Sequence, residues 1–152
     1  IGSGGGFFTF IFSEQVGKSG TVYDVDISQR HLGFIKAKAA EKGLLNVKTV
    51  LSDKDQPDMP EDGIDMVFAR NVFHHLKNPA SYFSGMKKYL KPDGRVVIID
   101  HKETARGGFV GLFKHYTSEE DIVNAMAESA FTVRERSDFL PEQSYLVFEM
   151  SE

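Results

Sequence analysis

The chain has 152 residues, of which 41% are apolar, so it is long enough to bury one sizeable core but short for two domains. Its formal net charge of -4 and the lack of any cluster of lysine and arginine argue against a nucleic-acid partner. Cysteine is absent, which excludes disulfides, thiol nucleophiles and zinc-thiolate sites, and we assign no metal. Neither a membrane-spanning apolar run nor a signal peptide is visible, so we expect a single cytoplasmic domain at residues 1–152.

Short β-rich runs alternate with helical patterns, which predicts an α/β fold with a mostly parallel sheet. The glycine-rich start is followed by a predicted helix at residues 7–16 and a predicted strand at residues 21–27. Ser28 can cap the next helix, in which apolar residues recur at helical spacing until Gly43 ends it. A strand-helix unit should therefore follow the glycine loop.

The remaining two thirds of the chain carry further strand and helix signals. The predicted elements are, in chain order, strands at residues 47–51 and 64–69, a helix capped by Asn78 that ends near Leu90, a turn at 91–94, a strand at 95–100, a mobile loop at 102–116, a helix from a capping box at Thr117 and Glu120 to about Ser129, and strands at 131–139 and 144–150. The connection between the last two strands is short, so they should pair antiparallel. The sheet should therefore end in an antiparallel hairpin.

The glycine-rich run GSGGG at residues 2–6 leads directly into the first predicted helix. Glycines let a backbone approach a ligand closely, and the N–H groups at a helix start can point at that ligand. A dinucleotide fingerprint needs glycine at the sixth position of Gly-x-Gly-x-x-Gly, where this chain has Phe7. A plain flexible turn between a strand and a helix is the alternative explanation.

Asp26 is the second candidate for a binding role, because it ends a predicted strand about twenty residues after the glycines. An acidic side chain at that place can accept hydrogen bonds from both hydroxyls of a ribose. Asp24 lies on the same face of the strand, so the alternation does not choose between them, but the position at the carboxyl edge favours Asp26. The alternative is an exposed aspartate at a strand end without a ligand.

Five motifs occur in an order that is more specific than any one of them. They are the glycine loop at 2–6, VYDVDIS at 22–28, Ser52-Asp53 after the strand at 47–51, NVFHHL at 71–76 and LKPDGR at 90–95. Together they resemble the class I S-adenosylmethionine-dependent methyltransferases, and most of all the group that includes the ubiquinone and menaquinone biosynthesis enzymes. The resemblance implies a Rossmann-like, doubly wound sheet and S-adenosylmethionine as the cofactor.

The resemblance also implies which residues bind this cofactor. Gly2, Ser3, Gly4 and Gly6 are expected to face its amino-acid part, Asp26 to hold the ribose with Ile27 beside it, Asp53 to meet the adenine amino group with Lys54 beside it, and Asn71 to lie near the methionine end. We expect methyl transfer to a small-molecule acceptor by in-line displacement, because a sulfonium methyl group is already activated and mainly needs alignment. No catalytic residue is assigned.

Four side chains are candidates for contact with the acceptor: His74, His75, His101 and Arg106. The imidazole of His74 or His75 could deprotonate a hydroxyl acceptor, since free histidine titrates near neutral pH. Packing between a strand and a helix explains the His-His-Leu run equally well. His101 and Arg106 flank or lie in the predicted loop, where ordinary solvated positions are the alternative.

The family pattern has a first strand and an acidic residue just before the glycine loop, and both are absent from this chain. The chain also opens without methionine inside the loop, so we expect an N-terminally truncated domain. The missing strand belongs in the middle of the sheet, where unpaired backbone groups are costly. We therefore expect upstream residues to fill the slot, the neighbouring strands to close up, or a second copy to lend a strand in a homodimer.

Two other functions remain open at this point. A cofactor-binding module without an acceptor site, acting as a regulator or partner subunit, would carry the same cofactor motifs. A nicotinamide dehydrogenase is disfavoured by Phe7 and by the terminal hairpin. Because one fold serves many reactions, the motifs do not identify the acceptor or the methylated atom.

Overall fold

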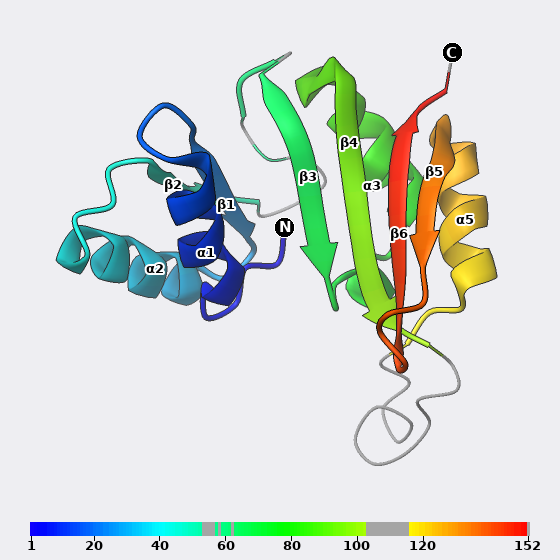
Figure 1. Cartoon of the computed structure of the whole chain (residues 1–152), viewed down its shortest axis with the longest axis horizontal. Helices are drawn as coiled ribbons and strands as arrows, with labels where there is room; N and C mark the ends of the chain where they lie inside the picture. The colour runs from blue at the N-terminus through cyan, green and yellow to red at the C-terminus, as the bar shows by residue number, and fades with distance from the viewer. Residues whose placement is uncertain (53–56, 58, 62, 103–115, 152) are drawn as a thin grey trace. The chain divides into compact units, whose positions relative to one another are not determined.

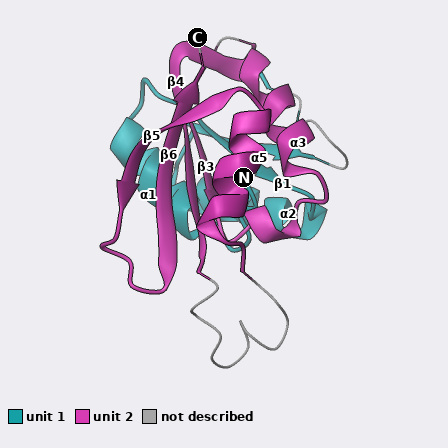
Figure 2. Cartoon of the chain, turned by 90° about the vertical axis from the view of Figure 1, so that its right-hand side faces the viewer, with its two compact units in different colours: residues 1–59 teal, residues 60–152 magenta. Residues whose placement is uncertain are grey.

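A computed structural model of the chain describes residues 1–52, 57, 59–61, 63–102 and 116–151. The chain divides into two compact units, Ile1–Met59 and Pro60–Glu152, which Figure 2 shows in different colours. We describe each unit by itself. Within the described residues, no helix combines the length and apolarity needed to cross a bilayer.

Among its described residues, the first unit has two helices and a two-stranded sheet, which Figure 1 shows. Its elements are α1 (Phe7–Val16), β1 (Val22–Asp26), α2 (Gln29–Glu41) and β2 (Val47–Leu51). Strands β1 and β2 pair in parallel along their whole length, from Val22 opposite Val47 to Asp26 opposite Leu51. The buried apolar core of this unit is small and consists mainly of Val25, Leu32, Ile35 and Ala39.

Local sequence signals explain why α2 begins and ends where it does. The Ser28 side chain accepts a hydrogen bond from the backbone N–H of His31 at 3.3 Å, which caps the first turn. Leu32, Ile35 and Ala39 recur at helical spacing and are buried. Gly43 follows the helix with a φ of 68°, in the left-handed region that glycine adopts easily. The predicted cap, core face and stop signal of this helix are confirmed.

The second unit is built on a four-stranded sheet with the order β3-β4-β6-β5. Its elements are β3 (Ile64–Arg70), the 3-10 turn η1 (Phe73–His75), α3 (Pro79–Met86), the 3-10 turn η2 (Lys87–Tyr89), β4 (Leu90–His101), α5 (Glu119–Glu128), β5 (Phe131–Ser137) and β6 (Gln143–Met150). Strands β3 and β4 are parallel, and β6 runs antiparallel to both β4 and β5. The predicted C-terminal antiparallel pair is therefore confirmed.

Helices α3 and α5 lie side by side on one face of this sheet (Figure 1). The fully buried side chains of the unit include Phe83, Met86, Val96, Ile98, Ile122, Met126, Phe131, Leu146 and Phe148. Alternation along β4 and β6 sends the intervening residues to the other face. There a smaller cluster forms from Val97, Ile99 and Val147, with Phe68, Leu140 and Tyr145 packed against it.

Several boundaries in the second unit differ from the sequence prediction. Helix α3 ends at Met86 and is followed by the 3-10 turn η2, where one helix to about Leu90 was predicted, and β5 ends at Ser137 instead of residue 139. The predicted turn at residues 91–94 lies inside β4, because Leu90 already pairs with Ile64 and the register shifts before Arg95 pairs with Met66. The turn signal therefore forms an irregularity within the strand. The cap of α5 is Ser118, one residue after the predicted Thr117, and its hydroxyl accepts from the backbone N–H of Asp121 at 3.0 Å.

The predicted first strand of the family pattern is not among the described strands. Strand β1 pairs only with β2, and β3 pairs only with β4, within the part of the chain that the structure describes. The expected filling of this slot by upstream residues or by a second copy stays a prediction. The mobile loop predicted at residues 102–116 lies almost wholly outside the described residues.

Candidate functional site

The glycine loop of the first unit depends on left-handed backbone conformations. Gly2, Gly4 and Gly6 have φ values of 66°, 50° and 76°. A Cβ atom on Gly4 or Gly5 would meet no other atom within 4 Å, so the backbone there borders open space. A Cβ on Gly6 would lie 2.9 Å from Cγ1 of Ile35. The loop is therefore open at its middle and tightly packed at its end.

The carboxylate of Asp26 joins the glycine loop to the end of β1. Its Oδ2 accepts from the backbone N–H of Gly4 at 3.0 Å, and its Oδ1 accepts from the backbone N–H of Ser28 at 2.8 Å. The side chain of His31 lies nearby, with Nδ1 3.5 Å from Oδ2. A carboxylate offers about four acceptor positions, so each Asp26 oxygen keeps capacity for one more donor. Ile27, which follows it, is 79% exposed.

Asp24, the competing candidate, occupies a different environment. It is buried, and its Oδ1 accepts from the hydroxyl of Thr9 on α1 at 3.0 Å. Its Oδ2 has no hydrogen-bond partner among the described residues. Burial raises the pKa of Asp24, although the nearby hydroxyl groups of Ser3 and Thr9 partly offset the effect. The structure therefore places Asp24 under α1 and leaves Asp26 at the strand end, as the sequence favoured.

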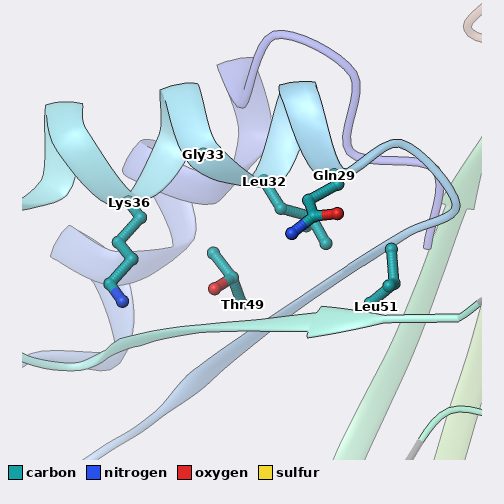
Figure 3. A pocket seen from close by; sticks show the side chains of 6 residues that line it. All are labelled: Gln29, Leu32, Gly33, Lys36, Thr49 and Leu51. Carbon is teal, nitrogen blue, oxygen red and sulfur yellow. The ribbon is translucent and has the colours of Figure 1, made fainter.

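A hollow of about 250 Å³ lies between α2 and β2 (Figure 3). In the figure, Gln29 and Lys36 extend from the helix toward Thr49 and Leu51 on the strand. It is lined by Gln29, Leu32, Gly33, Lys36, Thr49 and Leu51. None of the predicted site residues that the structure describes lines it, so we keep it separate from the candidate site.

In the second unit, Asp100 is fully buried near the carboxyl end of β4. Its Oδ1 lies 2.7 Å from Nδ1 of His74, and its Oδ2 accepts from the backbone N–H of the same histidine at 3.1 Å. The backbone N–H of His101 donates to Oδ1 at 2.8 Å. Because a carboxylate only accepts, the proton of the His74 ring lies on Nδ1 and the basic nitrogen is Nε2. The exposed His75 lies beside it, with ring centroids 4.1 Å apart and the ring planes inclined at 51°.

Asn71 follows β3 directly and has an unusual backbone conformation, with a φ of 55°. Its backbone N–H donates to the carbonyl of Ile99 at 2.8 Å. Its side-chain Oδ1 accepts from Nε2 of Gln143 at 2.6 Å, and Oε1 of Gln143 accepts from Arg70 at 2.8 Å. Gln143 is not among the predicted site residues, because it falls in the predicted connection between the last two strands.

The structure brings the predicted residues together in two groups. Gly2, Ser3, Gly4 and Gly6 meet Asp26 in the first unit, where Gly2 N–H also donates to the carbonyl of Val25 at 2.8 Å. Asn71, His74, His75 and His101 gather at the carboxyl ends of β3 and β4 in the second unit. Asp53, Lys54 and Arg106 lie outside the described residues.

The model of a protein family described as "Methyltransferase domain" matches residues 1–145, which is nearly the whole chain. The chain belongs to the methyltransferase domain family. Its cofactor is S-adenosylmethionine, and the predicted family resemblance is confirmed.

Curated relatives of this methyltransferase domain act on different acceptors. Over 99 residues the chain is 34% identical to a nocamycin O-methyltransferase from Saccharothrix syringae, covering 63% of this chain and 34% of the relative. Over 112 residues it is 30% identical to a demethylmenaquinone methyltransferase from Geobacillus sp. (strain WCH70), covering 72% of this chain and 47% of the relative. The chain thus spans less than half the length of these relatives.

Solved structures support the Rossmann-like methyltransferase fold. A SAM-dependent methyltransferase from Aquifex aeolicus superimposes with a TM-score of 0.87 at 24% identity, over 97% of this chain and 78% of that one. At this identity the likeness concerns the fold. The predicted fold class, including the mostly parallel sheet with antiparallel strands at its end, is therefore confirmed.

The residues of the first unit fit a nucleoside cofactor of this kind. A ribose presents two neighbouring hydroxyls, and the two Asp26 oxygens have acceptor capacity left for them. The amino-acid part needs close backbone approach, which the open space beside Gly4 and Gly5 permits. Gly6 serves the packing of the loop on Ile35.

Proposed function

We propose that this methyltransferase domain transfers a methyl group from S-adenosylmethionine to a small-molecule acceptor by in-line displacement. The observation that carries the proposal is the Asp26 carboxylate, which is fixed by Gly4 and Ser28 at the end of β1 and keeps one acceptor position on each oxygen. The cofactor supplies an activated methyl group. The protein's part is to hold donor and acceptor in line at near-attack distance.

We assign the cofactor residues as the family resemblance implies. Gly2, Ser3, Gly4 and Gly6 take the amino-acid part, Asp26 and Ile27 the ribose side, Asp53 and Lys54 the adenine, and Asn71 the methionine end. The left-handed conformations of the loop glycines support the first assignment, because side chains there would strain the backbone. The hydrogen bonds of Asp26 support the second.

For the acceptor we propose His74 as the residue that can take a proton. Asp100 holds the protonated Nδ1 of His74, which leaves Nε2 as the basic atom. The donors around Asp100, including the His101 N–H, keep this carboxylate and therefore the imidazole in one orientation. An acceptor that loses a proton on methylation, such as a hydroxyl, suits this arrangement. His75, His101 and Arg106 remain proposed acceptor contacts.

The names of the relatives support a small-molecule acceptor. One relative is an O-methyltransferase of nocamycin and another a demethylmenaquinone methyltransferase, so both act on compounds of low molecular weight. A hydroxylated aromatic or quinol compound is therefore the acceptor class to test first.

The experiment is transfer of a labelled methyl group from S-adenosylmethionine to a panel of phenols, quinols and amines. We expect turnover with at least one hydroxyl acceptor, and a large drop of turnover in His74→Asn with unchanged cofactor affinity. The control is Asp65→Asn, which changes an exposed carboxyl paired with Lys91 outside the proposed site and should leave turnover unchanged. Cofactor binding without turnover on any acceptor would favour the binding module instead.

A further inference from the structure

Three polar side chains form a continuous chain of hydrogen bonds at the carboxyl end of β3. Nη2 of Arg70 donates to Oε1 of Gln143 at 2.8 Å, and Nε2 of Gln143 donates to Oδ1 of Asn71 at 2.6 Å. Gln143 is only 6% exposed, so these contacts are shielded from water. It comes from the start of β6, whereas Arg70 and Asn71 lie at the end of β3.

The donor and acceptor groups of these three side chains fix the direction of the hydrogen bonds between them. A guanidinium group can only donate, so the oxygen of the Gln143 amide must face Arg70 and its NH2 group must face Asn71. The oxygen of Asn71 is then turned toward Gln143, and its own NH2 group is turned away from it. Among the described residues, nothing accepts a hydrogen bond from Nδ2 of Asn71.

The backbone of Asn71 is held in a strained conformation. Its φ of 55° lies in the left-handed region, which asparagine tolerates better than most residues but which still stores strain. Its N–H is tied to the carbonyl of Ile99. His101 pairs with Gln143 in the register of β4 and β6. Its Nδ1 atom is also buried and has no hydrogen-bond partner among the described residues.

We infer that Arg70, Gln143 and Asn71 form a polarised relay through which Asn71 presents an N–H donor to an oxygen of the bound ligand. The inference rests on the proposed function, in which the ligand is S-adenosylmethionine or its product. The amino-acid part of that ligand carries a carboxylate, which accepts, and an ammonium, which only donates. A donor on Asn71 therefore selects the carboxylate. Gln143 is a positioning residue that acts through Asn71.

The test compares two probes that differ in the amino-acid part. S-Adenosylhomocysteine carries the carboxylate, and 5′-methylthioadenosine lacks the whole amino acid. In Gln143→Glu, the carboxylate can only accept hydrogen bonds. The Asn71 amide must then turn its NH2 group toward residue 143 and present its oxygen to the ligand. We expect calorimetry to show at least about a tenfold loss of affinity for S-adenosylhomocysteine and a change within about twofold for 5′-methylthioadenosine.

A second variant keeps the test independent of Gln143. Asn71→Asp still accepts from Gln143 and suits the left-handed backbone, but it offers the ligand an oxygen in place of the N–H. We expect the same selective loss of S-adenosylhomocysteine binding. The matched control is Gln15→Glu on the exposed side of α1, which adds the same charge and should change neither affinity.

The outcomes separate this inference from the proposed function. If the unmodified chain binds neither probe, the proposed function fails and the inference falls with it. If the unmodified chain binds both, equal losses for the two probes in either variant, or no loss for either probe, would overturn the relay while leaving the proposed function intact.

Discussion

Replacing Asp26 by asparagine separates two roles of this carboxylate, which holds the glycine loop and is proposed to accept ribose hydroxyls. Asparagine keeps one acceptor oxygen, so the N–H of either Gly4 or Ser28 loses its partner. Since Asp26 is only 7% exposed, that loss should lower the free energy of unfolding by about 1.5–3 kcal/mol without any ligand. It should also weaken the affinity for S-adenosylhomocysteine about 10–100-fold.

Chemical denaturation with and without S-adenosylhomocysteine measures both effects together. At a ligand concentration of about 100 times the dissociation constant, the unmodified protein should gain roughly 2.7 kcal/mol of stability. In Asp26→Asn the gain should fall to roughly 0.4–1.4 kcal/mol at the same concentration. Asp65→Asn is the control, because Asp65 is highly exposed and its carboxylate pairs with the exposed Lys91, and it should change stability by less than about 0.5 kcal/mol.

Denaturation without ligand tests whether Asp26 holds the glycine loop, and the gain with ligand tests whether Asp26 binds the ribose. An unliganded Asp26→Asn protein as stable as the unmodified chain would show that the bonds to Gly4 and Ser28 do not hold the loop. A lower stability with a full ligand-dependent gain would leave Asp26 as an anchor of the loop and move the ribose role to another residue.

Three further predictions concern stability and are measured by denaturation. Gly4→Ala should cost about 1 kcal/mol from its positive φ alone, whereas Gly6→Ala should cost about 2–4 kcal/mol, because its φ is also positive and its Cβ would meet Ile35 at 2.9 Å. Equal costs would contradict the packing role of Gly6. Burial raises the pKa of Asp24, so the folded state binds the proton more tightly than the unfolded state, and this contribution to stability is lost as pH rises through the raised value. Asp24→Asn should therefore stabilise the protein at pH 7, with a gain that shrinks toward about pH 4; a gain independent of pH would refute the assignment. Asp100→Asn should cost about 2–4 kcal/mol, because an amide cannot serve all the donors that meet this buried carboxylate, and a neutral effect would show that they do not depend on its charge.

Most elements of the fold could be predicted because their signals are local. The cap at Ser28, the periodic apolar residues of α2 and the stop at Gly43 all act within a few residues of one another. The prediction of a turn at residues 91–94 was wrong because the structure there depends on a distant part of the chain. Pairing of Leu90 with Ile64 extends β4 backwards across the turn signal, and such tertiary pairing is invisible in a short window.

In the candidate site, too, residues with local sequence signals could be predicted and residues that depend on distant partners could not. Asp26 and the glycines could be found because motif spacing places them at one end of β1. His74 could be named from its motif, but its partner Asp100 lies on a buried strand 26 residues away, where a single aspartate gave no signal. Gln143 was missed because its partners are 72 and 73 residues away and because it falls in the predicted connection between the last two strands.

The most direct test of the proposed function is the choice between two ligands that both contain adenosine. Calorimetric titration and the shift in Tm should be measured on the full chain with S-adenosylhomocysteine and, separately, with NAD. We predict saturable binding and a raised Tm with S-adenosylhomocysteine, and neither with NAD, because only a ligand that binds the folded state stabilises it. Equal stabilisation by NAD, or no binding of S-adenosylhomocysteine by a folded chain, would contradict the proposed function.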